Sequence, residues 1–318
     1  MSGLIQAAEA FFDQLTSIVW ASLGLALICH VLKVGARTRA WRNILVAAYP
    51  GARIRWRDVF GAYVAGVGIN GLVPARAGDV LKLYLVKSRI EGATYPTLAS
   101  TLAVDTLFDT VVSLLLLSWA LSLGLLPGLD VLPSLPSIDW LWLFRYPWLA
   151  AGVAFVLVVG SFVLGVWSAR HIANFRRRVA QGFTILRTPR LYLRRVVAWQ
   201  ALDWGFRLGT LYFFLDAFNI PATLHNAILV QLSAGLSTIF PFTPGGVGTE
   251  QALLVYVLAG VASTSALLSF SIGMKLVLVA FNALLAFSAI ALMLKTLRWR
   301  GLVERDRLTE PDVPSSPA

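Results

Sequence analysis

Charged side chains that could bind an anion or a proton interrupt the apolar segments of this 318-residue chain. Asp105 and Asp109 stand four residues apart in one apolar segment, and Asp203 and Arg207 stand four apart in another. Residues at this spacing share one face of a helix. The Asp203–Arg207 pair can neutralise itself, whereas the two aspartates need a proton or a cation from elsewhere. We expect that cation to come from Arg76, Lys82 or Lys275.

A first polar break lies at residues 70–79, which read NGLVPARAGD. A helix that begins after Pro74 would turn unpaired amides toward an anion, and the Arg76 guanidinium would add a forked donor suited to phosphate. The alternative is a simple salt bridge between Arg76 and Asp79. The residues expected to bind substrate at this break are Asn70, Pro74, Arg76, Gly78, Asp79 and Lys82.

A second break lies at residues 241–250, which read PFTPGGVGTE. Its glycines would let backbone amides face a cavity, and Glu250 would cap the helix that follows. The alternative is tight packing of a helical hairpin. Together with Asp105 and Asp109, the expected substrate-binding residues here are Pro244, Gly245, Gly246, Gly248, Glu250 and Lys275.

The composition indicates a multi-pass membrane protein, because 58% of the residues are hydrophobic and only 14% are charged. The net charge of +11 comes from basic residues clustered in short loops, which favours an anionic membrane surface over nucleic acid. One cysteine excludes a disulfide framework within the chain, and the three histidines are far apart. We therefore expect no metal site and no cofactor.

Hydropathy predicts an all-α transmembrane helix bundle with five full spans and two re-entrant helical hairpins. The spans are expected at residues 15–32, 97–125, 148–167, 196–218 and 266–294. Lipid cannot hydrogen-bond an exposed backbone, so the two breaks would lie at hairpin tips that are buried in protein or line a wet cavity. One hairpin would open from each side of the membrane, as an inverted repeat requires.

The basic loops at residues 33–57 and 170–195 are expected in the cytoplasm. This orientation leaves the N-terminus outside and the C-terminus inside a cell inner membrane. Residues 1–300 would form the membrane domain, and residues 301–318 a disordered cytoplasmic tail.

The two breaks carry a family resemblance. Residues 74–85 resemble the Pro-Ala-Arg-x-Gly-Asp/Glu signature of a flippase-like integral-membrane family, the transmembrane region of lysylphosphatidylglycerol synthases and its stand-alone relatives. Residues 244–250 resemble that family's Pro-Gly-Gly-x-Gly-x-x-Glu signature, with the acidic residue one place early. Two departures concern charge, since Thr106 and Lys275 stand where the family often has arginine.

The resemblance implies a protein that binds or moves a lipid with a polar head group, often anionic or glycosylated. Fused synthases also carry an aminoacyl transfer domain, and only 18 residues follow Arg300 here, so aminoacylation by this polypeptide is not expected. The leading hypothesis is a lipid translocase or lipid-binding carrier rather than an enzyme, with phosphate-bearing membrane lipids as partners. The alternatives are an intramembrane enzyme acting on a lipid phosphate and a non-transporting organiser that binds anionic lipid.

Overall fold

The structure is a computed structural model that describes residues 17–72, 77–122, 174–239 and 248–296. These residues fold into helices, with no strand among them, which confirms the all-α prediction. In the first half the helices are α2 (Trp20–Ala48), α3 (Trp56–Leu72), α4 (Ala77–Lys87) and α5 (Tyr95–Ser122). In the second half they are η2 (Thr184–Arg187), α8 (Pro189–Tyr192), η3 (Leu193–Val197), α9 (Ala198–Ala217), α10 (Leu224–Ile239), α11 (Thr249–Val257) and α12 (Thr264–Thr296).

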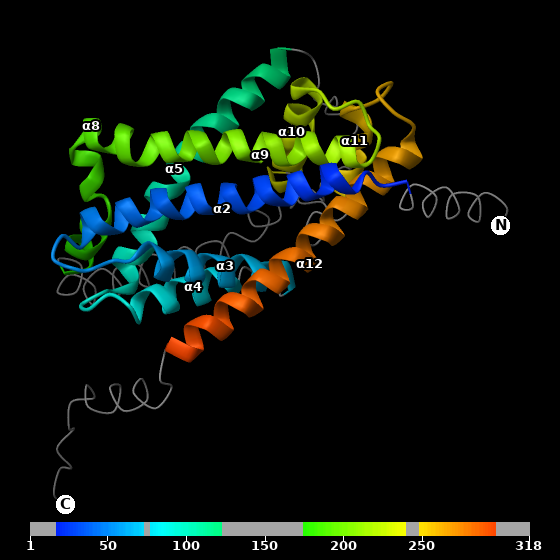
Figure 1. The fold of residues 1–318 in the computed structure, drawn as a ribbon. Coiled ribbons are helices and arrows are strands. Elements are labelled where there is room, and N and C mark those ends of the chain that lie inside the picture. Colours follow the sequence, from blue (N-terminus) through cyan, green and yellow to red (C-terminus); the bar gives the residue numbers. More distant parts are fainter. Residues whose placement is uncertain (1–16, 73–76, 123–173, 240–247, 297–318) are drawn as a thin grey trace, which may run out of the picture.

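The long helices α2 and α9 lie side by side along the bundle, and α12 crosses α3 (Figure 1). A hydrophobic core joins the C-terminal end of α9 to α10, α11 and α12. It contains buried aromatic and aliphatic side chains such as Phe214, Phe218, Leu254 and Phe270. A second hydrophobic core packs the C-terminal end of α2 against α3, α4 and α5. Between these two cores the helices carry polar side chains.

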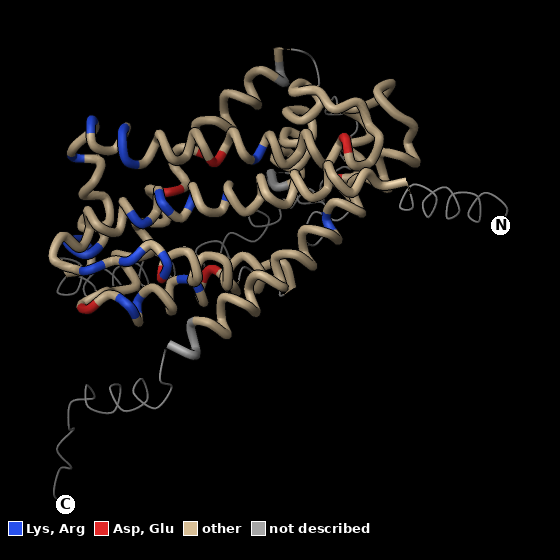
Figure 2. Tube along the Cα trace, viewed as in Figure 1, with Lys and Arg blue, Asp and Glu red and all other residues tan. Residues whose placement is uncertain are grey.

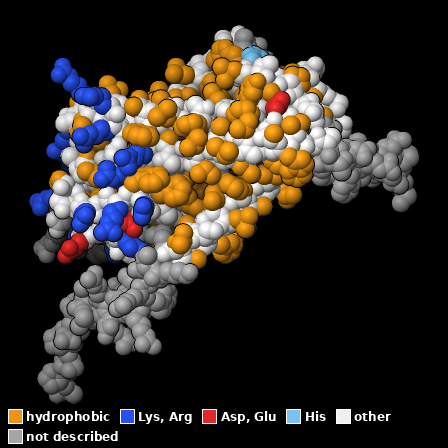
Figure 3. Space-filling view, viewed as in Figure 1, with side chains coloured by type: hydrophobic (Ala, Val, Ile, Leu, Met, Phe, Trp, Pro, Cys, Tyr) orange, Lys and Arg blue, Asp and Glu red, His pale blue; other side chains and the backbone are white. Residues whose placement is uncertain are grey.

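Three helical stretches are long and apolar enough to cross a membrane, among the residues that the structure describes: Trp20–Ala48, Tyr95–Trp119 and Thr264–Leu292. Large apolar side chains on them face outward, with Leu115 64% and Leu276 70% exposed. Figure 3 shows such side chains over the flank of the bundle, while lysine and arginine gather at one end. An exposed apolar flank of this kind is typical of a surface that faces lipid. The structure thus agrees with a multi-pass membrane protein.

The predicted span at residues 196–218 corresponds to α9, which is not among these three helices and carries Asp203, Arg207 and Asp216. The predicted span at residues 148–167 and the predicted tail at 301–318 lie outside the described residues. The division into a membrane domain and a tail stays a prediction.

The prediction that a loop begins at Lys33 is wrong. Helix α2 continues to Ala48, so the basic residues expected in the following loop at positions 33, 37, 39 and 42 are helical. A regular stripe explains the extension, because Val34, Arg37, Trp41 and Leu45 recur every three or four residues and are buried. Among the described residues, most lysines and arginines gather at one end of the bundle (Figure 2).

Both breaks connect helices that pack against each other. Residues 73–76 join α3 to α4, and residues 240–247 join α10 to α11. The packing of each pair agrees with a hairpin. Entry and exit of either pair on one side of the membrane stays a prediction, and so does the inverted repeat.

The α3–α4 pair depends on two glycines that bring the backbones together. A Cβ atom on Gly66 would lie 2.6 Å from the Gly78 carbonyl oxygen and 2.9 Å from the Lys82 Cβ atom. The Gly66→Ala variant is expected to lower the free energy of unfolding by about 1–3 kcal/mol, since the helices must move apart. Thermal unfolding of the detergent-purified protein measures the loss. The control is Gly71→Ala, whose added Cβ atom would meet Val279 at an ordinary 3.8 Å. Equal midpoints for the two variants would contradict the close approach.

Candidate functional site

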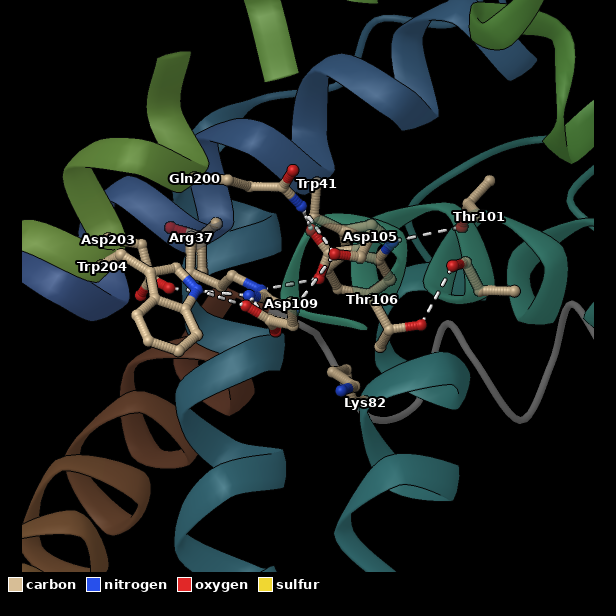
Figure 4. Close-up of polar contacts among 12 residues, drawn as sticks. Arg37, Trp41, Lys82, Thr101, Asp105, Thr106, Asp109, Gln200, Asp203 and Trp204 are labelled. Carbon is tan, nitrogen blue, oxygen red and sulfur yellow. Dashed lines mark hydrogen bonds and ion pairs between the residues drawn. The ribbon is translucent and has the colours of Figure 1, made fainter. Parts of the chain in front are cut away.

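A buried charge network joins α2, α5 and α9 at Arg37, whose side chain is only 7% exposed (Figure 4). The Arg37 Nε atom lies 2.8 Å from Asp105 Oδ2. Its Nη1 atom lies 2.6 Å from Asp109 Oδ2 and 3.5 Å from Asp203 Oδ2. One guanidinium therefore faces three carboxylates that come from two other helices.

Helix α9 completes the network with polar side chains that point toward α5. Arg207 Nη2 lies 3.2 Å from Asp203 Oδ2 and 3.9 Å from Asp109 Oδ1. Trp204 Nε1 donates a hydrogen bond of 2.8 Å to Asp109 Oδ1, and Gln200 Nε2 donates one of 2.6 Å to the Asp105 carbonyl oxygen. The expected Asp203–Arg207 pair exists, and both of its members also face charged residues of other helices.

The cation that faces Asp105 and Asp109 differs from the predicted partners. Arg37 occupies this position, together with Arg207, whereas the sequence predicts a loop at Arg37. The expected partners pair elsewhere: Lys82 with Asp79 at 3.1 Å, and Lys275 with Glu250 at 2.7 Å. Arg76 lies outside the described residues.

The first break places a lysine among aromatic rings. Lys82, which is 9% exposed, has its Nζ atom 4.9 Å from the centroid of the Tyr63 ring and 5.7 Å from that of Trp41. Asn70 holds the start of α4, because its Oδ1 atom accepts a hydrogen bond of 2.8 Å from the Gly78 amide. The Asn70 Nδ2 atom also donates to Asp79 Oδ1 at 3.2 Å.

A polar cavity of about 450 Å³ joins this break to the charge network. Its lining residues come from α2, α3, α4 and α5: Arg37, Tyr63, Asn70, Asp79, Lys82, Leu102, Ala103, Asp105 and Thr106. Four of the predicted site residues, Asn70, Asp79, Lys82 and Asp105, thus line one cavity. Asp109 is joined to it through Arg37, and Gly78 through Asn70. Pro74, like Arg76, lies outside the described residues.

The second break ends at a separate ion pair. Gly248 precedes α11 with a φ of +92°, a conformation that favours glycine, and its amide donates to Gln251 Oε1 at 2.7 Å. Gln251 rather than Glu250 therefore caps this amide, while Glu250 binds Lys275 of α12. Glu250 and Lys275 are not among the residues that line the polar cavity. Pro244, Gly245 and Gly246 lie outside the described residues.

Histidine contributes to packing in this structure. His30 is buried on α2, and its Nε2 atom lies 2.8 Å from Asn282 Oδ1 of α12. Within the described ranges, no three histidine, cysteine or acidic side chains form a group that could hold a metal ion. The three aspartates of the network instead face Arg37.

The fold and the site define a multi-pass helical membrane protein with acidic and basic side chains buried between its helices. Residues 4–286 match the sequence model of the lysylphosphatidylglycerol synthase TM region, and the chain belongs to that family. It is also similar to a UPF0104 membrane protein of Methanocaldococcus jannaschii, with 24% identity over 76% of this chain and 97% of that protein. No solved structure matches the chain. The family resemblance drawn from the two breaks is confirmed.

Proposed function

We propose that the protein binds a membrane lipid by its anionic head group in the polar cavity and carries that lipid between the two leaflets. The observation that supports this proposal is the pair of buried cations, Lys82 and Arg37, that line one cavity between helices of a membrane protein. A buried charge in such a protein is costly and commonly marks a substrate pathway. On this proposal the protein is a carrier rather than an enzyme.

Lys82 is the first contact that we propose for the head group. Its ammonium group is a compact triple donor, and it forms an ion pair with Asp79, whose side chain is partly exposed. An entering phosphate would replace Asp79 at Lys82, and Asp79 would turn to water. The Asn70 amide at the cavity wall would donate to the same oxygens.

Arg37 is the next cation along the cavity, and its three carboxylates hold it in place. An isolated ion entering a low-dielectric interior faces an idealised cost of order 20 kcal/mol. Lys82 and the Asn70 amide in the cavity reduce that cost for the head group. The proposed orientation has the basic end of the bundle (Figure 2) in the cytoplasm and the protein in the plasma membrane.

The Lys82→Met variant is expected to weaken binding of phosphatidylglycerol by roughly tenfold or more, because a hydrogen bond to a charged group contributes about 1.5–3 kcal/mol. Native mass spectrometry of the detergent-purified protein measures binding, and leaflet exchange of the same lipid in reconstituted vesicles measures transport. The matched control is Lys87→Met, since Lys87 is an exposed lysine of the same helix that lies outside the cavity lining.

Equal losses in the two lysine variants would show that the effect is general surface charge and would reject the cavity as the binding site. Binding without leaflet exchange would favour a lipid-binding organiser. A chemically altered lipid after incubation with purified protein would favour an enzyme.

A further inference from the structure

A second cavity, of about 270 Å³, lies between α5, α9 and α10. Its lining is mainly leucine and indole: Ser113, Leu116, Leu117, Trp204, Gln231, Leu232, Gly235 and Leu236. None of these lining side chains is charged. A head group moved into this cavity would lose water without gaining an ion partner, so its lining suits an apolar occupant.

The charge network separates the two cavities. Thr106 lines the polar cavity and Ser113 lines the apolar one, seven residues further along α5. At about 1.5 Å per residue the two positions are about 10 Å apart along the helix. Asp109 stands between them and accepts a hydrogen bond from Trp204, which is itself a wall of the apolar cavity.

The flank of α5 beside the apolar cavity faces outward with large side chains. Leu114 and Leu115, which directly precede the lining residues Leu116 and Leu117, are both mostly exposed. In a membrane these side chains face hydrocarbon. The apolar cavity is therefore next to the lipid phase on one side and to the head-group cavity, across Asp109, on the other.

We propose that the apolar cavity binds a hydrocarbon chain of the lipid whose head group occupies the polar cavity. This inference rests on the proposed function, and adds that the protein selects its lipid by chain as well as by head group. A leucine side chain placed in the cavity would take the space of the hydrocarbon chain, so a filled variant would lose packing contacts with a long chain and keep the contacts with the head group.

The experiment uses Gly235→Leu, because a Cβ atom on Gly235 would meet no atom within 4 Å and the side chain would extend into open space. The matched control is Gly205→Leu, an exposed position of α9 that also has no atom within 4 Å of the added Cβ atom and does not line the cavity. The probes are dipalmitoyl and dihexanoyl phosphatidylglycerol, which share one head group and differ in chain length. Binding of each to detergent-purified protein is measured by native mass spectrometry.

We expect Gly235→Leu to bind the dipalmitoyl lipid roughly tenfold more weakly than the unmodified protein, with binding of the dihexanoyl lipid unchanged. Gly205→Leu should bind both lipids as the unmodified protein does. Ser113→Leu, which fills the cavity from α5, should repeat the chain-selective loss and serves if Gly235→Leu does not fold.

Unchanged binding of both probes in the two filled variants would overturn the inference and leave the head-group proposal intact. An equal loss of both probes would also overturn it, because a chain site must distinguish long chains from short ones. If the unmodified protein binds neither probe, the proposed function itself is rejected. In that case Lys82→Met and the unmodified protein would also not differ in lipid binding.

Discussion

Replacing Arg37 by methionine is expected to lower the free energy of unfolding by about 3–5 kcal/mol. The variant removes the guanidinium that lies within ion-pair distance of Asp105, Asp109 and Asp203. Asp105 is the most affected of the three because it is buried and Arg37 is the one cation in ion-pair contact with it among the described residues. Breaking a buried pair by removing one partner leaves an uncompensated charge, which costs more than the pair itself contributes.

Thermal unfolding in detergent measures this loss, and Arg39→Met is the matched control. Arg39 is two residues away on the same helix, but it is exposed and lies over the Trp199 ring, with 5.9 Å from its Cζ atom to the ring centroid. An exposed cation–aromatic contact contributes only about 0.5–1 kcal/mol. Similar melting midpoints for the two variants would contradict the central role of Arg37.

A second substitution separates lost charge balance from lost packing. Adding Asp105→Asn to Arg37→Met removes the carboxylate that the first change leaves unpaired, so the double variant should be more stable than Arg37→Met alone. Residues in one ion-pair network are not additive, and the deviation from additivity measures their coupling. Strictly additive losses would show that Arg37 acts through packing of its side chain alone.

The sequence predicts the first break better than the network because the residues of the break are close in the chain. Asn70, Asp79 and Lys82 lie on two consecutive helices, α3 and α4, and their pattern indicates a polar pocket without knowledge of distant contacts. Asp105 and Arg37 are 68 residues apart, and nothing local pairs them. A charged residue inside an apolar helix indicates that it needs a partner of opposite charge, but it does not indicate which residue that partner is.

Hydropathy alone does not identify Arg37, because the first positive charge, at Lys33, predicts the end of the span. The signal that contradicts this interpretation is the spacing of Val34, Arg37, Trp41 and Leu45, which places the arginine in the middle of a buried stripe. The mean hydropathy of a sequence window falls at each arginine. The helical spacing of buried residues, in contrast, continues unchanged through an arginine. Periodicity was therefore the better guide to the length of α2.

Reversing one charge of the Glu250–Lys275 pair is expected to cost about 2 kcal/mol or more in unfolding free energy, because Glu250→Lys places two ammonium groups where a 2.7 Å ion pair stood. The expected loss is smaller than for Arg37 because the Lys275 side chain is 33% exposed and water screens it in part. The swapped double variant, Glu250→Lys with Lys275→Glu, should regain most of the lost stability. Thermal unfolding of the two single variants and the double variant completes the cycle.

The swap matters for the proposed carrier because α12 contacts both helix pairs. Lys275 of α12 forms the ion pair with Glu250 of α11, which belongs to the second pair. Seven residues later, Asn282 of α12 packs closely against α3: a Cβ atom added to Gly68 would lie 2.6 Å from the Asn282 carbonyl oxygen. If the Glu250–Lys275 contact acts only as a tie between α11 and α12, the swapped protein should exchange phosphatidylglycerol between leaflets at nearly the unmodified rate. A swapped protein that is as stable as the unmodified one but inactive would instead show that the sign of each charge matters, as it must if Lys275 contacts the anionic head group. A double variant no more stable than the single ones would contradict the pair itself.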